Sequence, residues 1–217
     1  MPVDAEFLHA LIHDLKGPVS RIRILGELLT RQTASLDAES QLLVKHMETS
    51  AIAAQSVLEG LRRYADAVGW EFRPQKFDLT LALTAAMARL DARLTSNGAT
   101  VTYGDLPEIC ADMGQMATLF EELLANALRF RSPDAPVVEI AVMPAESNFW
   151  LICVTDNGIG LSDSDAQRIF RPLAKASDRS GAGMGLTICS RIATLHGGEI
   201  RAIPRLRGAE FHLRLPR

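Results

Sequence analysis

The sequence predicts an α+β fold: a two-helix hairpin in residues 1–69, then an α/β sandwich in residues 70–217. Two observations support this division. In the first part, apolar residues recur at steps of three and four, the period of amphipathic helices. In the second part, strand-like and helix-like segments alternate, which is typical of helices that cover one face of a mixed sheet.

The first part contains two predicted helices that are separated by the polar break "RQTASLDAES". Ser35 or Asp37 could cap the second helix, and the short break makes the two helices antiparallel neighbours. Such a hairpin buries little apolar surface by itself. We therefore expect a homodimer through residues 4–68, in which two hairpins form a four-helix bundle. The alternative is that the hairpin packs on the rest of its own chain.

The second part is read from the period of its apolar residues and from its turn residues. The expected strands are residues 73–77, 99–103, 137–143, 149–155, 198–203 and 209–215. The expected helices are residues 79–97, 113–130 and 186–196.

Composition excludes several classes of protein. The formal net charge is −3, so no general basic field indicates nucleic-acid binding. No apolar run approaches the about 20 residues of a membrane span, and no secretory signal is visible. The cysteines, Cys110, Cys153 and Cys189, follow no metal or redox spacing. We expect them to be small buried residues of a cytoplasmic protein.

The helix expected at residues 113–130 carries a polar stripe. Glu122, Asn126 and Arg129 follow one another at four and three residues and share one face. A carboxylate, an amide oxygen and a cation suit a magnesium-bound polyphosphate, because Mg²⁺ prefers oxygen ligands. Taken alone, the stripe is weak evidence, since such a face is usually just solvated.

Two glycine-rich stretches follow. The strand in "ICVTDNGIGLS" leads into Asp156, Gly158 and Gly160, where the glycines allow a close backbone approach to a ligand. Asp156 could accept a hydrogen bond from an exocyclic amine, although a plain turn is the alternative. The stretch "RSGAGMGLTICS" precedes a helix, whose backbone amides favour phosphate. Its glycines are Gly181, Gly183 and Gly185.

Together, the Asn-bearing helix, D-x-G-x-G and G-x-G-x-G resemble the ATP-binding fold of histidine kinases, gyrase, heat-shock chaperones and mismatch-repair ATPases. "RIFRPLAKAS" is similar to the family's phenylalanine box, and "GAEFHLRLP" to its terminal Gly-x-x-Phe strand. In the first helix, "HDLKGP" resembles the phosphoacceptor box of sensor histidine kinases. The resemblance extends from about Phe7 to Pro216. It implies a dimerisation and histidine phosphotransfer domain, residues 1–69, and a GHKL-type catalytic ATP-binding domain, residues 70–217.

The phosphoacceptor box places helix-breaking residues inside a helix. One explanation is a surface kink; the other is that His13 reacts. Pro18 removes a backbone donor and crowds the carbonyl of Asp14, so we expect a bend just past His13. The Asp14 carboxylate can hold one ring nitrogen of His13 and leave the other as the nucleophile.

The resemblance implies roles for the other site residues. Asn126 would coordinate Mg²⁺, and Asp156 would recognise the adenine amino group of ATP. Arg129 stands where the family usually has Lys and would contact phosphate. Lys175 stands where the family often has a cation in the lid. The nucleotide pocket and its lid would be shaped by Gly158, Gly160, Gly181, Gly183 and Gly185.

Two positions depart from the family pattern. Glu122 stands where many sensor kinases have a second Asn. It could assist magnesium through water, help proton transfer, or be a solvated acid. Gly17 lies four residues after the acceptor histidine, where bifunctional members carry Thr or Asn to orient the water that dephosphorylates the regulator. Glycine has no side chain for this, so we expect weak or no phosphatase activity.

The leading hypothesis is an ATP-dependent histidine kinase that phosphorylates His13 and passes the phosphoryl group to an Asp of a response regulator receiver domain. One alternative is a non-catalytic dimeric phosphotransfer or scaffold protein with a degenerate nucleotide domain. ATP binding distinguishes these two. A plain ATPase or serine kinase of the same superfamily is the third hypothesis. The chain is either a fragment or a small kinase that responds to a separate sensor protein, and the sequence leaves both open.

Overall fold

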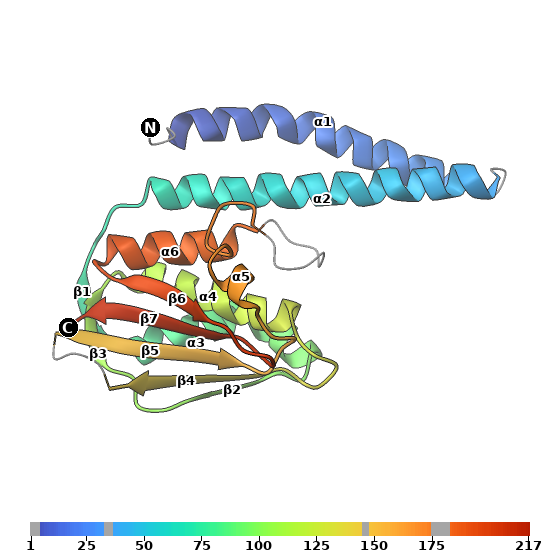
Figure 1. The fold of residues 1–217 in the computed structure, drawn as a ribbon. Coiled ribbons are helices and arrows are strands. Elements are labelled where there is room, and N and C mark those ends of the chain that lie inside the picture. The colour runs from blue at the N-terminus through green and yellow to red at the C-terminus, as the bar shows by residue number, and fades with distance from the viewer. Residues whose placement is uncertain (1–4, 33–36, 145–147, 175–182) are drawn as a thin grey trace. The chain divides into compact units, whose positions relative to one another are not determined.

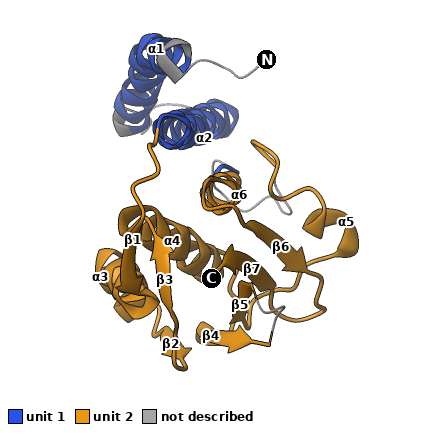
Figure 2. Ribbon diagram, turned by 90° about the vertical axis from the view of Figure 1, so that its left-hand side faces the viewer, with its two compact units in different colours: residues 1–69, 180–184 blue, residues 70–179, 185–217 orange. Residues whose placement is uncertain are grey.

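The computed structural model describes residues 5–32, 37–144, 148–174 and 183–217. The chain divides into two compact units, which Figure 2 colours separately. The first unit comprises residues 1–69 with 180–184, and the second comprises residues 70–179 with 185–217. The α+β fold class that the sequence predicts is confirmed. Among the helices that the structure describes, none combines the length and apolarity needed to cross a bilayer.

The first unit is built on two long helices, α1 (Ala5–Gln32) and α2 (Ala38–Val68), which pack against each other (Figure 1). Helix α1 continues through Pro18 without interruption. Of the two caps predicted for α2, Asp37 is confirmed: its Oδ1 accepts a hydrogen bond from the backbone N–H of Ser40 at 2.7 Å. Ser35 lies outside the described residues.

Cross-helix contacts show that α1 and α2 are antiparallel, as predicted. Nε2 of Gln55 donates to Oγ of Ser20 at 3.2 Å, and Oγ1 of Thr30 donates to Oε1 of Glu48 at 2.7 Å. Between these two contacts, Gly26 is buried, and a Cβ there would lie 2.8 Å from Cγ of Glu48. Glycine therefore lets the two helices approach closely near the loop end of the hairpin.

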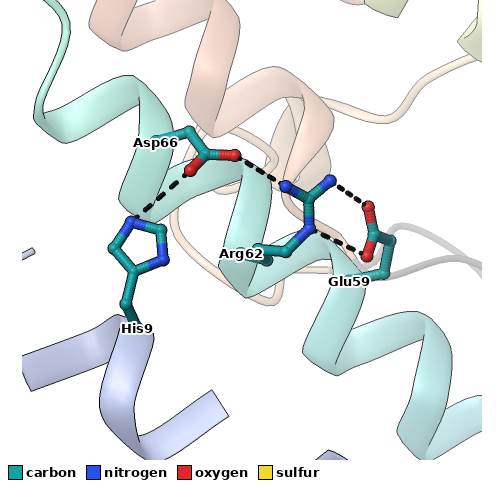
Figure 3. Close-up of polar contacts among 4 residues, drawn as sticks. All are labelled: His9, Glu59, Arg62 and Asp66. Carbon is teal, nitrogen blue, oxygen red and sulfur yellow. Dashed lines mark hydrogen bonds and ion pairs between the residues drawn. The ribbon is translucent and has the colours of Figure 1, made fainter. Parts of the chain in front are cut away.

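A chain of polar contacts joins the helices at the other end of the hairpin (Figure 3). Nε2 of His9 lies 3.4 Å from Oδ1 of Asp66, whose Oδ2 lies 3.0 Å from Nη1 of Arg62. Arg62 also donates to both carboxylate oxygens of Glu59, at 2.7 and 3.1 Å. Because these groups are half-exposed, each pair contributes at most about 1 kcal/mol. Within this network the contact between His9 and Asp66 crosses from α1 to α2, so the network adds little to the stability of the hairpin.

The second unit contains a five-stranded sheet in the order β2-β4-β5-β7-β6. Its strands are β2 (Thr100–Tyr103), β4 (Val137–Met143), β5 (Phe149–Asp156), β6 (Glu199–Ile203) and β7 (Glu210–Pro216). Strands β2 and β4 are parallel and the other pairs are antiparallel, so the sheet is mixed, as predicted.

Three helices lie on one side of this sheet (Figure 1): α3 (Leu79–Ser96), α4 (Met113–Arg129) and α6 (Gly185–Leu195). Side chains alternate along the central strands, because successive residues of a strand point to opposite faces. Ile152, Val154, Phe211 and Leu213 are buried on the helix side. The opposite face carries the intervening residues, among them Cys153, Glu210 and His212.

The sequence did not predict two elements of this unit. Strand β3 (Glu108–Ala111) pairs antiparallel with β1 (Gln75–Asp78) in a separate two-stranded sheet. Helix α5 (Asp163–Ala166) is a single turn. The expectation that Cys110 is buried is wrong: β3 buries Ile109 and Ala111 and exposes Cys110, which lies between them. The other two cysteines, Cys153 and Cys189, are buried as expected.

Candidate functional site

His13 lies on α1 with its side chain 89% exposed to solvent. Its Nδ1 is 3.3 Å from Oδ1 of Asp14, which is itself 82% exposed. A carboxylate beside Nδ1 favours the tautomer that carries the proton there, and the lone pair then resides on Nε2. This geometry leaves Nε2, the outer ring nitrogen, free of the Asp14 contact.

Helix α4 carries the Asn-bearing stripe. It begins at Asp112, whose Oδ1 accepts a hydrogen bond from the N–H of Gln115 at 3.0 Å. Glu122 and Asn126 are only 6% and 8% exposed, whereas Arg129 is exposed at the end of the helix. This burial contradicts the interpretation of Glu122 as a solvated acid, one of the three roles that the sequence leaves open.

Asn126 has an unsatisfied polar atom. Its Nδ2 is buried and has no hydrogen-bond partner among the described residues. Buried polar groups are nearly always hydrogen-bonded, so an orphan in a native fold indicates a missing partner. The oxygen and nitrogen of an amide can be exchanged by a half-turn of the side chain, so the orphan position can equally hold the oxygen. Asn126 therefore fits a site for a cation or a polar ligand.

The carboxylate of Glu122 lies against the start of α6. A Cβ at Gly185, the first residue of that helix, would overlap Oε2 of Glu122. Because Gly185 has no side chain, the Glu122 carboxylate can occupy this position. The N-terminus of a helix also stabilises a negative charge. In the same turn of α6, Thr187 is buried, and its hydroxyl has no partner among the described residues. Thr187 was not predicted from the sequence, although a hydroxyl two residues after the last glycine of the motif was a visible signal.

Asp156 ends β5 and is held by two backbone donors. Its Oδ1 accepts hydrogen bonds from the N–H groups of Gly158 at 2.8 Å and Ala209 at 3.0 Å. Oδ2 has no hydrogen bond within the part of the chain that is described. Burial raises the pKa of the Asp156 carboxyl, while the two backbone hydrogen bonds and the charge of Arg205 act in the opposite direction. One oxygen is thus fixed, and the other is free to accept from a ligand.

The glycines that follow Asp156 permit close packing of backbone on backbone. A Cβ at Gly158 would lie 2.5 Å from the carbonyl oxygen of Phe130. A Cβ at Gly160 would lie 2.5 Å from the carbonyl oxygen of Leu206, and its φ of +95° disfavours any other residue. Both glycines are required by the fold of this turn, which supports the interpretation that it is more than an ordinary Asp-Asn-Gly loop.

Gly208 completes this turn and was not among the predicted site residues. A Cβ there would overlap the carbonyl oxygen of Asp156, and its φ is +73°. Its N–H donates to the carbonyl oxygen of Gly158 at 2.9 Å. The glycine of the Gly-x-x-Phe motif was the signal for this role. Asn157 has a structural role. Its Oδ1 accepts a hydrogen bond from the N–H of Val137, and its Nδ2 donates to the carbonyl oxygen of Ala135, at 2.9 Å each.

Three predicted glycine-loop and lid residues remain. Lys175 and Gly181 lie outside the described residues. Gly183 has a φ of +67°, which favours glycine, and groups with the first compact unit.

The chain is similar to several known proteins. Residues 111–217 match the family described as histidine kinase-, DNA gyrase B-, and HSP90-like ATPase. Cyanobacterial phytochrome A of Nostoc sp. is 31% identical over 216 residues, which cover 97% of this chain and 28% of that protein. The adaptive-response sensory kinase SasA of Synechococcus sp. is 26% identical over 219 residues, covering 96% of this chain and 56% of that kinase. The chain thus spans between about a quarter and a little over half of these relatives.

Solved structures with the same fold include two that match almost the entire chain. Full-length ShkA in complex with AMPPNP gives a TM-score of 0.69 at 24% identity and covers 99% of this chain and 46% of that one. The Acinetobacter baumannii histidine kinase AdeS gives a TM-score of 0.64 at 17% identity, covering 94% of this chain and 97% of that one. Residues 111–217 therefore match a GHKL-type ATPase domain, and the order of the motifs together with these similar kinases supports a sensor histidine kinase core for the chain.

Proposed function

We propose that this chain is the kinase core of a two-component system, which uses Mg-ATP to phosphorylate His13 and transfers the phosphoryl group to an Asp of a response regulator. The observation that carries the proposal is the exposed His13 with Asp14 beside its Nδ1, in a chain that also contains an ATPase domain of the GHKL family. Residues 1–69 would serve as the dimerisation and phosphotransfer domain, and residues 70–217 as the catalytic domain.

The proposed chemical step transfers the γ-phosphoryl group of ATP to His13. The Nε2 lone pair of His13 attacks the γ-phosphorus of ATP, the bond to the oxygen that bridges the β- and γ-phosphates breaks, and ADP leaves with that electron pair. The ring gains positive charge, which the neighbouring Asp14 carboxylate stabilises through the Nδ1 proton. The phosphoryl group then moves from Nε2 to a carboxylate oxygen of the receiver domain.

The nucleotide would be held by the residues of α4 and the two glycine motifs. The amide oxygen of Asn126 would hold Mg²⁺, which neutralises phosphate charge when bound. Glu122, buried against the start of α6, would assist magnesium through water or help proton transfer. Arg129 would contact phosphate, and Oδ2 of Asp156 would accept from the adenine amino group.

The loops around the nucleotide complete the proposed site. Gly158 and Gly160 would allow the adenine end to approach the backbone. Gly183 and Gly185 would do the same for the phosphates, together with Gly181. Lys175 would add a cation in the lid.

The proposed homodimer through residues 4–68 is supported by the apolar surface of the hairpin. Several large apolar side chains there are exposed: Leu11, Leu15, Ile22, Ile24, Leu25, Leu28, Leu29, Leu42, Leu43 and Ile52. Fully burying one leucine or isoleucine is worth about 1.5–3 kcal/mol, so pairing of two such faces is strongly favoured. The expected partners are a second copy of this chain, a receiver domain and a separate sensor protein or domain.

The experiment that tests the proposal is incubation with Mg²⁺ and γ-labelled ATP. We expect label on the unmodified chain that is labile to acid and stable to alkali, and no label on His13→Gln. His9→Gln is the matched control, because His9 lies one turn earlier on the same helix and is paired with Asp66. Labelling of both variants would contradict His13 as the acceptor. If the chain neither takes up label nor binds ATP, the non-catalytic phosphotransfer hypothesis replaces this one.

A further inference from the structure

We propose that Cys153, Glu210 and His212 form a Zn²⁺ site on the face of the sheet opposite the helices. This site is separate from the nucleotide site, and the inference does not depend on the proposed kinase activity. From its sequence context, Cys153 was expected only to be a small buried residue, because the spacing of the cysteines indicates no metal site. The pairing of β5 with β7 is what brings them together.

The three side chains share one patch of the sheet. Cys153 of β5 is directly opposite His212 of β7, and Glu210 lies two residues before His212 on the same face. Sγ of Cys153, an imidazole nitrogen and a carboxylate oxygen all lie within 4.8 Å of one another. Nε2 of His212 and Oε1 of Glu210 are 2.6 Å apart.

These distances are close to those of a zinc site. Bonds of about 2.0–2.3 Å in a tetrahedral site place neighbouring ligand atoms about 3.5 Å apart. The separation of 2.6 Å between His212 and Glu210 is shorter than that value, and the sulfur lies within 4.8 Å of both ligand atoms, so small rotations of the exposed ends of His212 and Glu210 would complete the geometry. These two side chains are 29% and 24% exposed, whereas Cys153 is buried, so an ion would enter from the solvent side and meet the sulfur last.

The donor set selects zinc over magnesium or calcium. A thiolate is a soft ligand, and with imidazole and carboxylate it suits Zn²⁺, whereas Mg²⁺ and Ca²⁺ take oxygen ligands. Three protein ligands leave a fourth position for water. Oε2 of Glu210 is already engaged by Nη1 of Arg205 at 2.8 Å, which leaves Oε1 for the metal and orients the carboxylate.

Binding needs no redox partner. The Sγ–H bond of Cys153 breaks, its proton goes to solvent, and the sulfur lone pair forms the bond to zinc. The hydrogen bond between Nε2 of His212 and Oε1 of Glu210 breaks, the proton of the neutral ring shifts through solvent to Nδ1, and the Nε2 lone pair binds the ion. The two anionic ligands balance the charge of the ion.

The test uses Co²⁺ as a spectroscopic probe for Zn²⁺ on the purified, metal-free chain. We expect one equivalent of Co²⁺ to give a thiolate-to-cobalt charge-transfer band, and Zn²⁺ to displace it. The band should be absent in Cys153→Ser and unchanged in Cys189→Ser, a matched control at another buried cysteine. If Cys153→Ser unfolds, as judged by circular dichroism, His212→Gln serves instead and should weaken Zn²⁺ binding by at least about 10-fold. The site would be overturned if the folded unmodified chain gave no band, or if the band persisted in folded Cys153→Ser. Undiminished Zn²⁺ affinity in His212→Gln would overturn it as well.

Discussion

Asp156→Asn is expected to weaken ATP binding while it stabilises the fold. The substitution leaves Oδ1 in place as the acceptor for the N–H groups of Gly158 and Ala209. It replaces Oδ2, the proposed acceptor for adenine, by a donor. A hydrogen bond to a charged group is worth about 1.5–3 kcal/mol, so the affinity for ATP should fall by about 10- to 150-fold.

The direction of the stability change follows from the pKa. Burial raises the pKa of the Asp156 carboxyl above its ordinary value of 3.8, so the folded state binds this proton more tightly than the unfolded state. The charged carboxylate therefore costs stability, and this cost accumulates as the pH rises from the unfolded pKa through the folded pKa. At neutral pH the uncharged Asn avoids the cost. Asp156→Asn should therefore raise the free energy of unfolding at neutral pH.

Urea unfolding and calorimetric titration with ATP would measure the two effects on the same preparations. The gain in unfolding free energy should shrink as the pH is lowered below the folded pKa of Asp156. Asp105→Asn makes the same chemical change at an exposed position and should alter neither property. Unchanged ATP affinity in Asp156→Asn would refute the adenine contact, and a loss of stability at neutral pH would refute the argument from burial.

Three further substitutions have clear expected outcomes. Gly208→Ala should lower the unfolding free energy by about 2–4 kcal/mol in urea, because its Cβ meets a backbone carbonyl oxygen at positive φ, whereas Gly104→Ala, which meets nothing within 4 Å, should be nearly neutral. Gly17→Thr, also free of contacts within 4 Å, should confer phosphatase activity toward the phosphorylated regulator; robust phosphatase activity of the unmodified chain would contradict this. Leu25→Asp, in the exposed hairpin face, should shift sedimentation toward the monomer, and Leu206→Asp, at an exposed position of the second unit, should not.

The fold was largely predictable because its long helices and strands show a clear periodicity of apolar residues. Helix α1 and the strands β4 and β5 contain enough residues for a clear apolar pattern. Strand β3 has four residues and α5 is one turn, which is too short for either period to be recognised. Periodicity also carries no information on pairing partners, so the separate β1–β3 sheet could not be foreseen.

The candidate site was predictable where a residue type carries the chemistry. His13, Asn126 and Asp156 stand in motifs whose spacing is read directly from the chain. The contributions of Gly208 and Ala209 depend instead on where the last strand pairs, which only the folded backbone reveals. The burial of Glu122 was missed for a similar reason: the stripe of α4 predicts a shared face, but not that α6 covers it.

The hydrogen bond from Ala209 to Asp156 joins residues 53 positions apart in the chain. Contacts between distant residues form late, because the intervening loop must first be closed at an entropic cost. During synthesis, Asp156 therefore leaves the ribosome well before the strand that holds its carboxylate. A nascent chain can complete this turn only after β7 has paired with β5, so we expect the proposed adenine contact of Asp156 to become possible only after that pairing.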